Sequence, residues 1–144
     1  MTTVQQVFDT AIYMMDEQTE NNGKTDTADT REYKYRTLAL LNALIPQLYP
    51  YSDTYDVSSG TGRPVAPILA MPADLSKVDF TQVIPLDDTL ALAVLPYGLA
   101  AHLLASENDE LSAWFSNRFN QALIDLRSKI PGVFEPISAP YGFF

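Results

Sequence analysis

His102 is the only histidine in the chain, and imidazole is a common general base and metal ligand near neutral pH. It lies in an apolar run, beside Leu103, Leu104 and Ala105. The sequence has no second histidine and no cysteine that could complete a metal site with it. We therefore interpret His102 as a structural residue at a helix surface or a subunit contact.

Asp87 and Asp88 form a carboxylate pair that could serve acid–base chemistry or bind a cation. Adjacent residues at a helix start point in different directions, however, so we expect these side chains to cap a helix. The run from Gly60 to Gly62 lacks the strand–turn–helix context and the Lys-Ser/Thr pair of a phosphate loop. No Gly-x-Ser-x-Gly nucleophile elbow is present. The sequence predicts no enzymatic activity, no cofactor and no metal site.

Composition narrows the class of protein further. With 144 residues, 47% of them hydrophobic, the chain suits a single domain. Its net charge of −9 disfavours a surface that grips nucleic acid, because phosphate binding depends on Lys and Arg. The absence of cysteine excludes disulfides and thiolate metal sites and fits an intracellular protein. We also expect no signal peptide, because no basic leader precedes an apolar run.

Residues 89–106 form the most apolar stretch of the chain and would have to be covered on more than one side as a helix. Its length raises the question of a membrane span. Pro96 and Gly98 at its centre, His102 and the acidic flanks on both sides argue against one. We therefore expect no membrane insertion, and predict a buried helix of a bundle in which small residues such as Gly98 permit close helix approach.

Apolar residues at helical spacing predict four helices, at about residues 3–20, 26–48, 87–106 and 109–129. The second could start at Asp26 or Thr27, or at Asp29 or Thr30. The first should be capped by Thr2 or Thr3 and stopped at residues 21–23, and the first two should form an antiparallel pair. Pro46 should bend or end the second helix, and any bend in the third should fall at Pro96. The residues expected to face inward are Val4, Val7, Phe8, Ala11, Ile12 and Met15, then Tyr33, Leu40 or Leu41, Leu44 and Ile45, and finally Leu111, Trp114, Phe115, Phe119, Ala122, Leu126 and Ile130.

Two segments fall outside the helices. Residues 49–85 are rich in proline, glycine and tyrosine and predict a long, protruding central loop, in which pieces near 65–69 and 80–84 could pair as a short β-hairpin. Residues 131–144 predict an extended C-terminal tail, because Pro136 and Pro140 are incompatible with a helix. The predicted fold is therefore a single, mostly α domain over residues 1–144, a small four-helix bundle with a long central loop and an extended tail.

The tail and the central loop carry residue types that favour assembly over catalysis. Two phenylalanines left in water would forfeit about 2–3 kcal/mol of burial each, so the tail should fold back on its own helices or dock on another subunit. The loop contains tyrosine and arginine, which are enriched in interfaces, although a merely solvated loop is an equal alternative. The candidate contact residues are Tyr51, Tyr55, Arg63, Pro140, Tyr141, Phe143 and Phe144.

The sequence from Ile84, IPLDDTLALAVLPYGLAAHLLASENDELSAWFSNRFNQALIDLRSK, followed by FEPISAPYG, resembles the head–tail connector proteins of siphophage-like phages and prophages, also called adaptor or neck proteins. The likeness lies in the Leu-Asp-Asp helix start, the Gly/Ala-rich apolar helix, the acidic turn, the aromatic–Arg–aromatic helix and the Pro-Tyr-Gly ending. It is looser over the first two helices. The terminal Phe143-Phe144 departs from the Gly-hydrophobic ending of the family.

The resemblance implies a structural virion protein that assembles in the bacterial host cytoplasm and resides in the virion neck. Such proteins form a ring, commonly a dodecamer, beneath the portal protein, and they offer a platform to the next neck or tail protein. DNA would pass through the lumen without sequence-specific binding, which suits an acidic chain. The alternative is a soluble cytosolic helical interaction or regulatory domain without a virion role.

Overall fold

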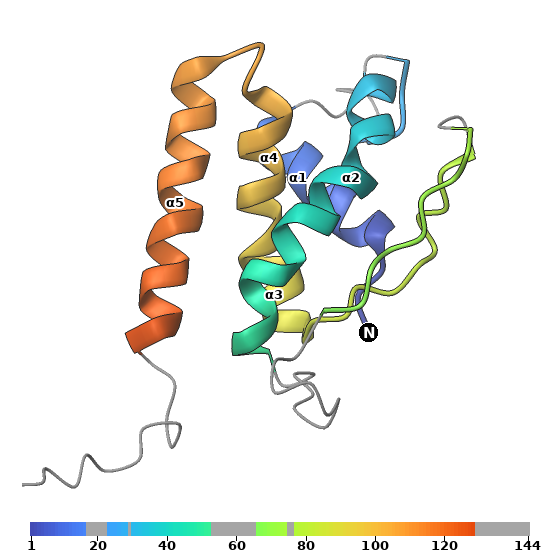
Figure 1. The fold of residues 1–144 in the computed structure, drawn as a ribbon. Helices are drawn as coiled ribbons and strands as arrows, with labels where there is room; N and C mark the ends of the chain where they lie inside the picture. The colour runs from blue at the N-terminus through green and yellow to red at the C-terminus, as the bar shows by residue number, and fades with distance from the viewer. Residues whose placement is uncertain (17–22, 29, 53–65, 75–76, 129–144) are drawn as a thin grey trace, which may run out of the picture.

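Helix α4 (Leu95–Leu104) is the centre of the fold, and α1 (Val4–Met15), α2 (Arg31–Leu48) and α5 (Asp109–Ser128) each pack on it. Helix α3 (Asp88–Ala93) leads directly into it. The structure is a computed structural model that describes residues 1–16, 23–28, 30–52, 66–74 and 77–128. The helices alternate in direction along the chain, with α3 and α4 together forming the third of four arms (Figure 1). The predicted mostly α, four-helix fold is confirmed.

The burial of α4 explains its composition. Leu95, Leu99 and Leu103 are fully buried, and Gly98 and Ala100 are buried beside them, whereas His102 is exposed. Neighbours on several sides cover a helix that is apolar around most of its circumference. The prediction that residues 89–106 need cover on more than one side is therefore confirmed. Because α1 and α2 both pack mainly on α4, they contact each other less than the predicted antiparallel pair would.

The predicted third helix is divided into two. Helix α3 ends at Ala93, and Val94, with φ −114° and ψ −49°, joins it to α4. Pro96 lies in the first turn of α4, where its missing N–H has no intrahelical partner to lose. The proline was expected to bend a continuous helix at its own position; the helix instead restarts just before it.

Helix α1 begins as predicted and ends early. Thr3 caps it: the Gln6 N–H donates to Thr3 Oγ1 at 3.3 Å, and the Thr3 N–H donates to Gln6 Oε1 at 2.9 Å. The helix stops at Met15 because Asp16 adopts the left-handed conformation, with φ 59°. Asp tolerates this conformation better than most residues, so the stop comes before the predicted residues 21–23.

Helix α2 runs through Pro46 to Leu48 and continues into the short 3₁₀ helix η1 (Tyr49–Tyr51). Pro46 therefore does not end it. Thr30 holds the N-cap position, within the predicted start region, but its hydroxyl donates to the Thr25 carbonyl at 2.6 Å and organises the preceding turn.

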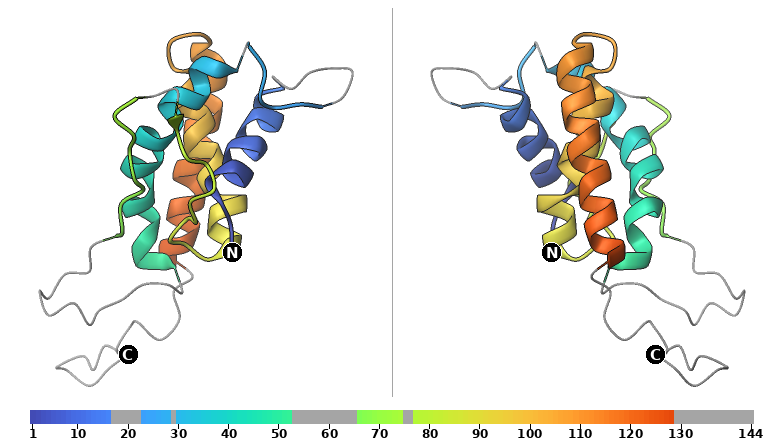
Figure 2. Two further views of the ribbon diagram at one scale, coloured as in Figure 1. Left: turned by 90° about the vertical axis from the view of Figure 1, so that its right-hand side faces the viewer. Right: turned by 90° about the vertical axis from the view of Figure 1, so that its left-hand side faces the viewer.

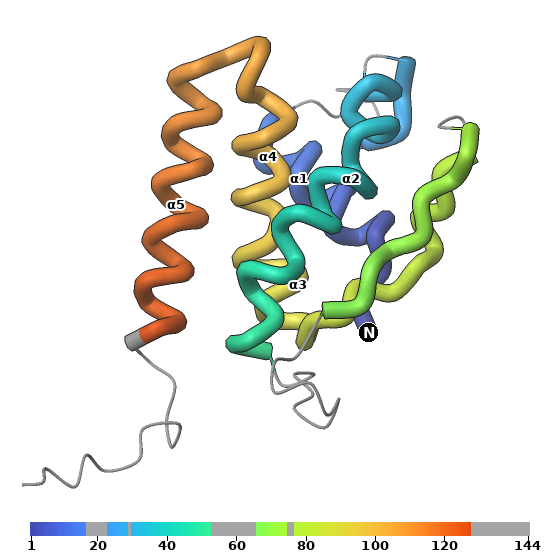
Figure 3. Tube along the Cα trace, viewed as in Figure 1, coloured from blue at the N-terminus to red at the C-terminus, as the bar shows by residue number. Residues whose placement is uncertain are grey.

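The described part of the central loop packs against the domain, so the predicted protruding loop is wrong for residues 66–74 and 77–85. Leu69, Phe80 and Ile84 are buried. The two arms of this part of the loop run side by side (Figure 3). In these described parts of the loop no strand forms, and the two arms do not pair as a hairpin.

Side-chain amides and the N-terminal residues hold the two arms in place. The Asn42 amide bonds both the N–H and the carbonyl of Leu69, at 2.8 and 3.1 Å. Gln82 does the same for Ala70, at 2.7 and 3.0 Å. The backbone near Gln82 pairs with the N-terminal residues, through Val4 N to Gln82 O at 2.9 Å and an isolated bridge between Thr3 and Val83.

Among the elements that the structure describes, α5 packs substantially only on α4. Its buried side chains are Phe115 and Phe119, at 3% and 5% exposure. The prediction of a broad buried face is wrong for Leu111 and Trp114, which are 41% and 49% exposed, because within the described part of the chain no second layer covers that edge of the helix. Ala122 and Leu126 are half-buried, and Ile130 lies outside the described residues.

Candidate functional site

Tyr51 is the one predicted contact residue that lies within the described part of the chain. It belongs to η1, is half-buried against the core, and its hydroxyl accepts a hydrogen bond from Arg127 Nε at 3.1 Å. Arg127 is in the last turn of α5. This bond joins the point where the chain leaves η1 to the point where it leaves α5. Tyr51 is therefore engaged inside the subunit.

Asp87 lies close to the same point. The Ser52 hydroxyl and Asp87 Oδ1 lie 2.9 Å apart, and the Asp87 N–H donates to Ser52 Oγ at 3.0 Å. Asp87 occupies the N-cap position of α3 without a side-chain cap bond, so the capping prediction is correct for its position and wrong for its carboxylate. We call the region formed by Tyr51, Ser52, Asp87 and Arg127 the basal end of the domain; it lies at the bottom of Figure 1.

Asp88 binds the N-terminal residues, so its carboxylate is not paired with that of Asp87 for acid–base chemistry or cation binding. Its Oδ1 accepts from the Thr2 hydroxyl at 2.7 Å, and its Oδ2 lies 3.5 Å from the Met1 ammonium. The Thr2 hydrogen bond, followed by the ammonium charge, lowers the pKa of Asp88. A shallow pocket of about 380 Å³, lined by Met1 and residues 83–88, opens beside it. The carboxylate therefore anchors the N-terminal segment to α3.

The other predicted contact residues lie outside the described residues. They are Tyr55, Arg63, Pro140, Tyr141, Phe143 and Phe144. What the structure does place is the two positions from which their segments depart. Residues 53–65 follow Ser52 and residues 129–144 follow Ser128, and the Tyr51–Arg127 hydrogen bond brings these two departure points together.

His102 is exposed on α4, as its interpretation as a surface histidine requires. Among the described residues, no group of three or more His, Asp or Glu side chains could hold a metal ion. None of the helices in the described ranges is both long and apolar enough to span a membrane.

Sequence reasoning missed an aromatic cluster on the surface between α4 and α5. The Arg118 guanidinium carbon lies 5.2 Å from the centre of the Trp114 ring and 6.0 Å from that of Tyr97. The Trp114 ring meets Phe115 edge-on at 5.0 Å. Together with the half-buried Tyr97, the exposed side chains Leu111, Trp114 and Arg118 form what we call the aromatic face. The spacing of apolar residues along α5 did not predict the aromatic face, because spacing alone cannot show which edge of a helix other elements leave uncovered.

A second apolar surface lies on the described part of the central loop. Ile68 and Met71 are 80% and 45% exposed, although Leu69 between them is buried. Asp74 follows on the same arm and is exposed. We call Ile68, Met71 and Asp74 the loop ridge. The Asn42 and Gln82 amides bind the backbone of Leu69 and Ala70 beneath the ridge, so hydrogen bonds to the rest of the domain fix its position.

Comparisons with known protein families, with curated proteins and with solved structures give no significant match to this chain.

Proposed function

We propose that this protein is a structural, non-enzymatic subunit of a phage or prophage neck, which forms a ring beneath the portal and joins head to tail. The observation that carries the proposal is the basal end. Residues 53–65 and 129–144, whose aromatic and proline-rich composition favours contacts, both start at the basal end. The Arg127–Tyr51 hydrogen bond holds their two starting points together. The sequence resemblance to head–tail connectors adds the identity of the partners.

The rest of the subunit suits a structural role. A core built on α4 supplies a rigid body, and the groups that would have to carry chemistry are engaged in holding it together, as Asp87 and Asp88 are. The net charge of −9 would let DNA pass through a lumen without adhering to it. In this proposal the partners are further copies of the chain, the portal and the next neck or tail protein, and the protein is assembled in the host cytoplasm.

The direct test mixes the purified protein with the portal ring of the same genome and images the product by electron microscopy. The expected result is an additional ring of density on the tail-facing side of the portal. Deleting residues 138–144 should leave the helical circular dichroism signal unchanged and abolish that layer. The matched control is Tyr13→Ala, at an exposed position near the C-terminal end of α1, which should add the layer normally.

A second variant tests the basal end itself. Tyr51→Phe removes the hydrogen-bond acceptor of Arg127 while keeping the aromatic ring, and should lower the free energy of unfolding by less than about 1.5 kcal/mol. Portal binding should weaken by more than this small stability change explains. Failure of the full-length protein to bind any portal, together with regulatory genes as its neighbours, would favour the cytosolic interaction domain instead.

A further inference from the structure

The aromatic face has the composition of a binding hot spot. Trp, Tyr and Arg dominate binding energy in protein interfaces, and here Arg118 lies against the rings of both Trp114 and Tyr97. Trp114 remains 49% exposed and Leu111 41% exposed. Among the described residues no carboxylate lies within ion-pair distance of Arg118. The face therefore offers a large apolar area and one cation whose charge is not matched within the described domain.

The loop ridge has the complementary properties. Among the described residues, Ile68 at 80% exposure is the most exposed large apolar side chain after Met1, and Met71 is a side chain that adapts to irregular surfaces. The ridge carries the acidic Asp74, and the adjacent arm carries Asp79, whose carboxylate accepts two hydrogen bonds from Thr81. Lys77 lies between these two acids, so acidic groups outnumber basic ones along this turn.

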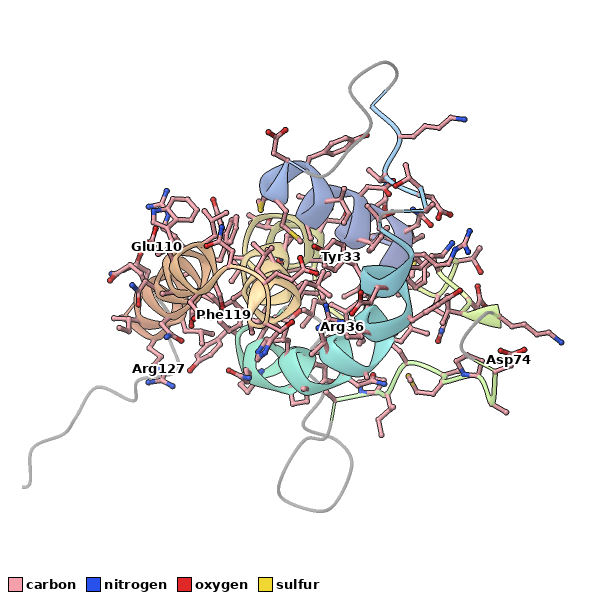
Figure 4. All side chains as sticks on the ribbon, turned by 90° about the horizontal axis from the view of Figure 1, so that it is seen from above. Tyr33, Arg36, Asp74, Glu110, Phe119 and Arg127 are labelled. Carbon is pink, nitrogen blue, oxygen red and sulfur yellow. The ribbon has the colours of Figure 1, made fainter. Side chains whose placement is uncertain are left out.

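These two surfaces lie on opposite sides of the subunit. The two views in Figure 2 place α5 in front in one and the loop arms in front in the other, with α4 between them. Figure 4 shows the same arrangement from above, with Glu110 of α5 and Asp74 of the loop at opposite margins of the domain. One subunit therefore cannot bring its own aromatic face onto its own loop ridge.

We propose that the aromatic face of one copy of this chain binds the loop ridge of the next copy. Each subunit then contacts two neighbours, one through each surface. In this contact the apolar side chains of the aromatic face pack on Ile68 and Met71, and Arg118 lies near the acidic groups Asp74 and Asp79. A contact between two different surfaces repeats from copy to copy and generates a ring or a filament. This inference deepens the proposed function by naming the contact that would close the ring.

The absence of cysteine permits a direct test by disulfide cross-linking. Leu111→Cys marks the aromatic face and Ile68→Cys marks the loop ridge; both positions are exposed, so neither change disturbs the core. Under mild oxidation at millimolar protein concentration, a mixture of the two variants should give a cross-linked dimer, and each variant alone should give little. The matched control pairs Ile68→Cys with Tyr13→Cys, another exposed position, and should not cross-link efficiently.

A side-specific variant separates a genuine contact from random collision. Trp114→Ser placed in the Leu111→Cys copy should lower the cross-linking yield at least about tenfold, as expected of a hot-spot residue. The same change placed in the Ile68→Cys copy should have no effect, which also shows that the variant folds. Efficient cross-linking of Leu111→Cys with itself, no enrichment of the mixed dimer over the Tyr13→Cys control, or an equal effect of Trp114→Ser in both copies would overturn the proposal.

A chain that carries both cysteines extends the test to ring closure. Oxidation should yield a ladder that ends in one closed species, whose subunit number equals that of the ring. Imaging with the portal then distinguishes the two proposals. Portal-bound rings without the mixed cross-link would leave the neck function standing and refute this contact, whereas cross-linked rings that bind no portal would support the contact and refute the neck function.

Discussion

Gly98→Ala tests whether the close contact between α4 and α5 organises the fold. A Cβ atom at Gly98 would lie 3.0 Å from both Cδ1 and Cε1 of Phe119 and 3.1 Å from Cδ2 of Leu44. Both neighbours are almost fully buried, at 5% and 1% exposure. Figure 4 shows Phe119 on the side of α5 that faces α4. The ring cannot bend, so it or the whole of α5 must move.

The magnitude follows from two opposing effects. Overpacking a core by one methyl group costs about 1–3 kcal/mol. Replacing glycine by alanine inside a helix gains about 1 kcal/mol, because alanine loses less backbone entropy on folding. With about 2 kcal/mol for the contact on Phe119 and Leu44, the free energy of unfolding should fall by about 1 kcal/mol. For a chain of this length the melting temperature should drop by about 3–4 °C.

Urea unfolding of the wild type and of Gly98→Ala measures the change, provided the slope with denaturant is unaltered. The same substitution in a Phe119→Leu background is the control, because leucine has no ring edge to meet the new methyl group. There the effect of Gly98→Ala should be more favourable by about 1 kcal/mol. A stabilising Gly98→Ala in the wild type, or an equal effect in both backgrounds, would show that the close contact with Phe119 does not limit the packing of α5.

Two further changes test the anchors of the loop and of the N-terminal segment. Asn42→Ala removes both side-chain hydrogen bonds to Leu69 and should lower the free energy of unfolding by about 1–3 kcal/mol, with faster proteolysis of the loop than in the wild type. The Asp88 pKa is lowered by the Thr2 hydrogen bond, so its contribution is present above the ordinary carboxyl value of 3.8 and is lost as the pH falls below it. The stability difference between wild type and Asp88→Asn should therefore shrink from about pH 6 to about pH 3 in denaturant titrations, and a difference that grows would contradict the assignment.

The helical part of the fold was predictable because its signals are local. The periodic apolar residues of α1 and the capping residue Thr3 specify that helix from its own sequence. The apolar circumference of α4 likewise required several neighbours. The split at Val94 was harder to predict, because Pro96 is compatible both with a bend in a continuous helix and with the first turn of a new one.

The surfaces of the domain were not predictable to the same degree, because they depend on tertiary neighbours. Trp114 has the spacing of a core residue, but among the described elements α5 packs mainly on α4, and Trp114 is 49% exposed. The loop was expected to protrude because it is rich in proline and glycine. Its described part is fixed by Asn42, an amide on a distant helix whose pairing with Leu69 leaves no pattern in the sequence.

In a ring, the basal end would bind the portal, whereas the aromatic face and the loop ridge would join neighbouring subunits. Subunits related by rotation about one axis present equivalent ends on the same side of the assembly. If the aromatic face and the loop ridge join the subunits laterally, every Tyr51–Arg127 pair lies on one rim, and the segments that follow Ser52 and Ser128 all start from that rim. Trp114→Ser should then prevent ring formation and, with it, portal binding. Tyr51→Phe should weaken portal binding while the closed, disulfide-linked ring still forms, and loss of the ring in that variant would show that the basal end serves lateral assembly instead.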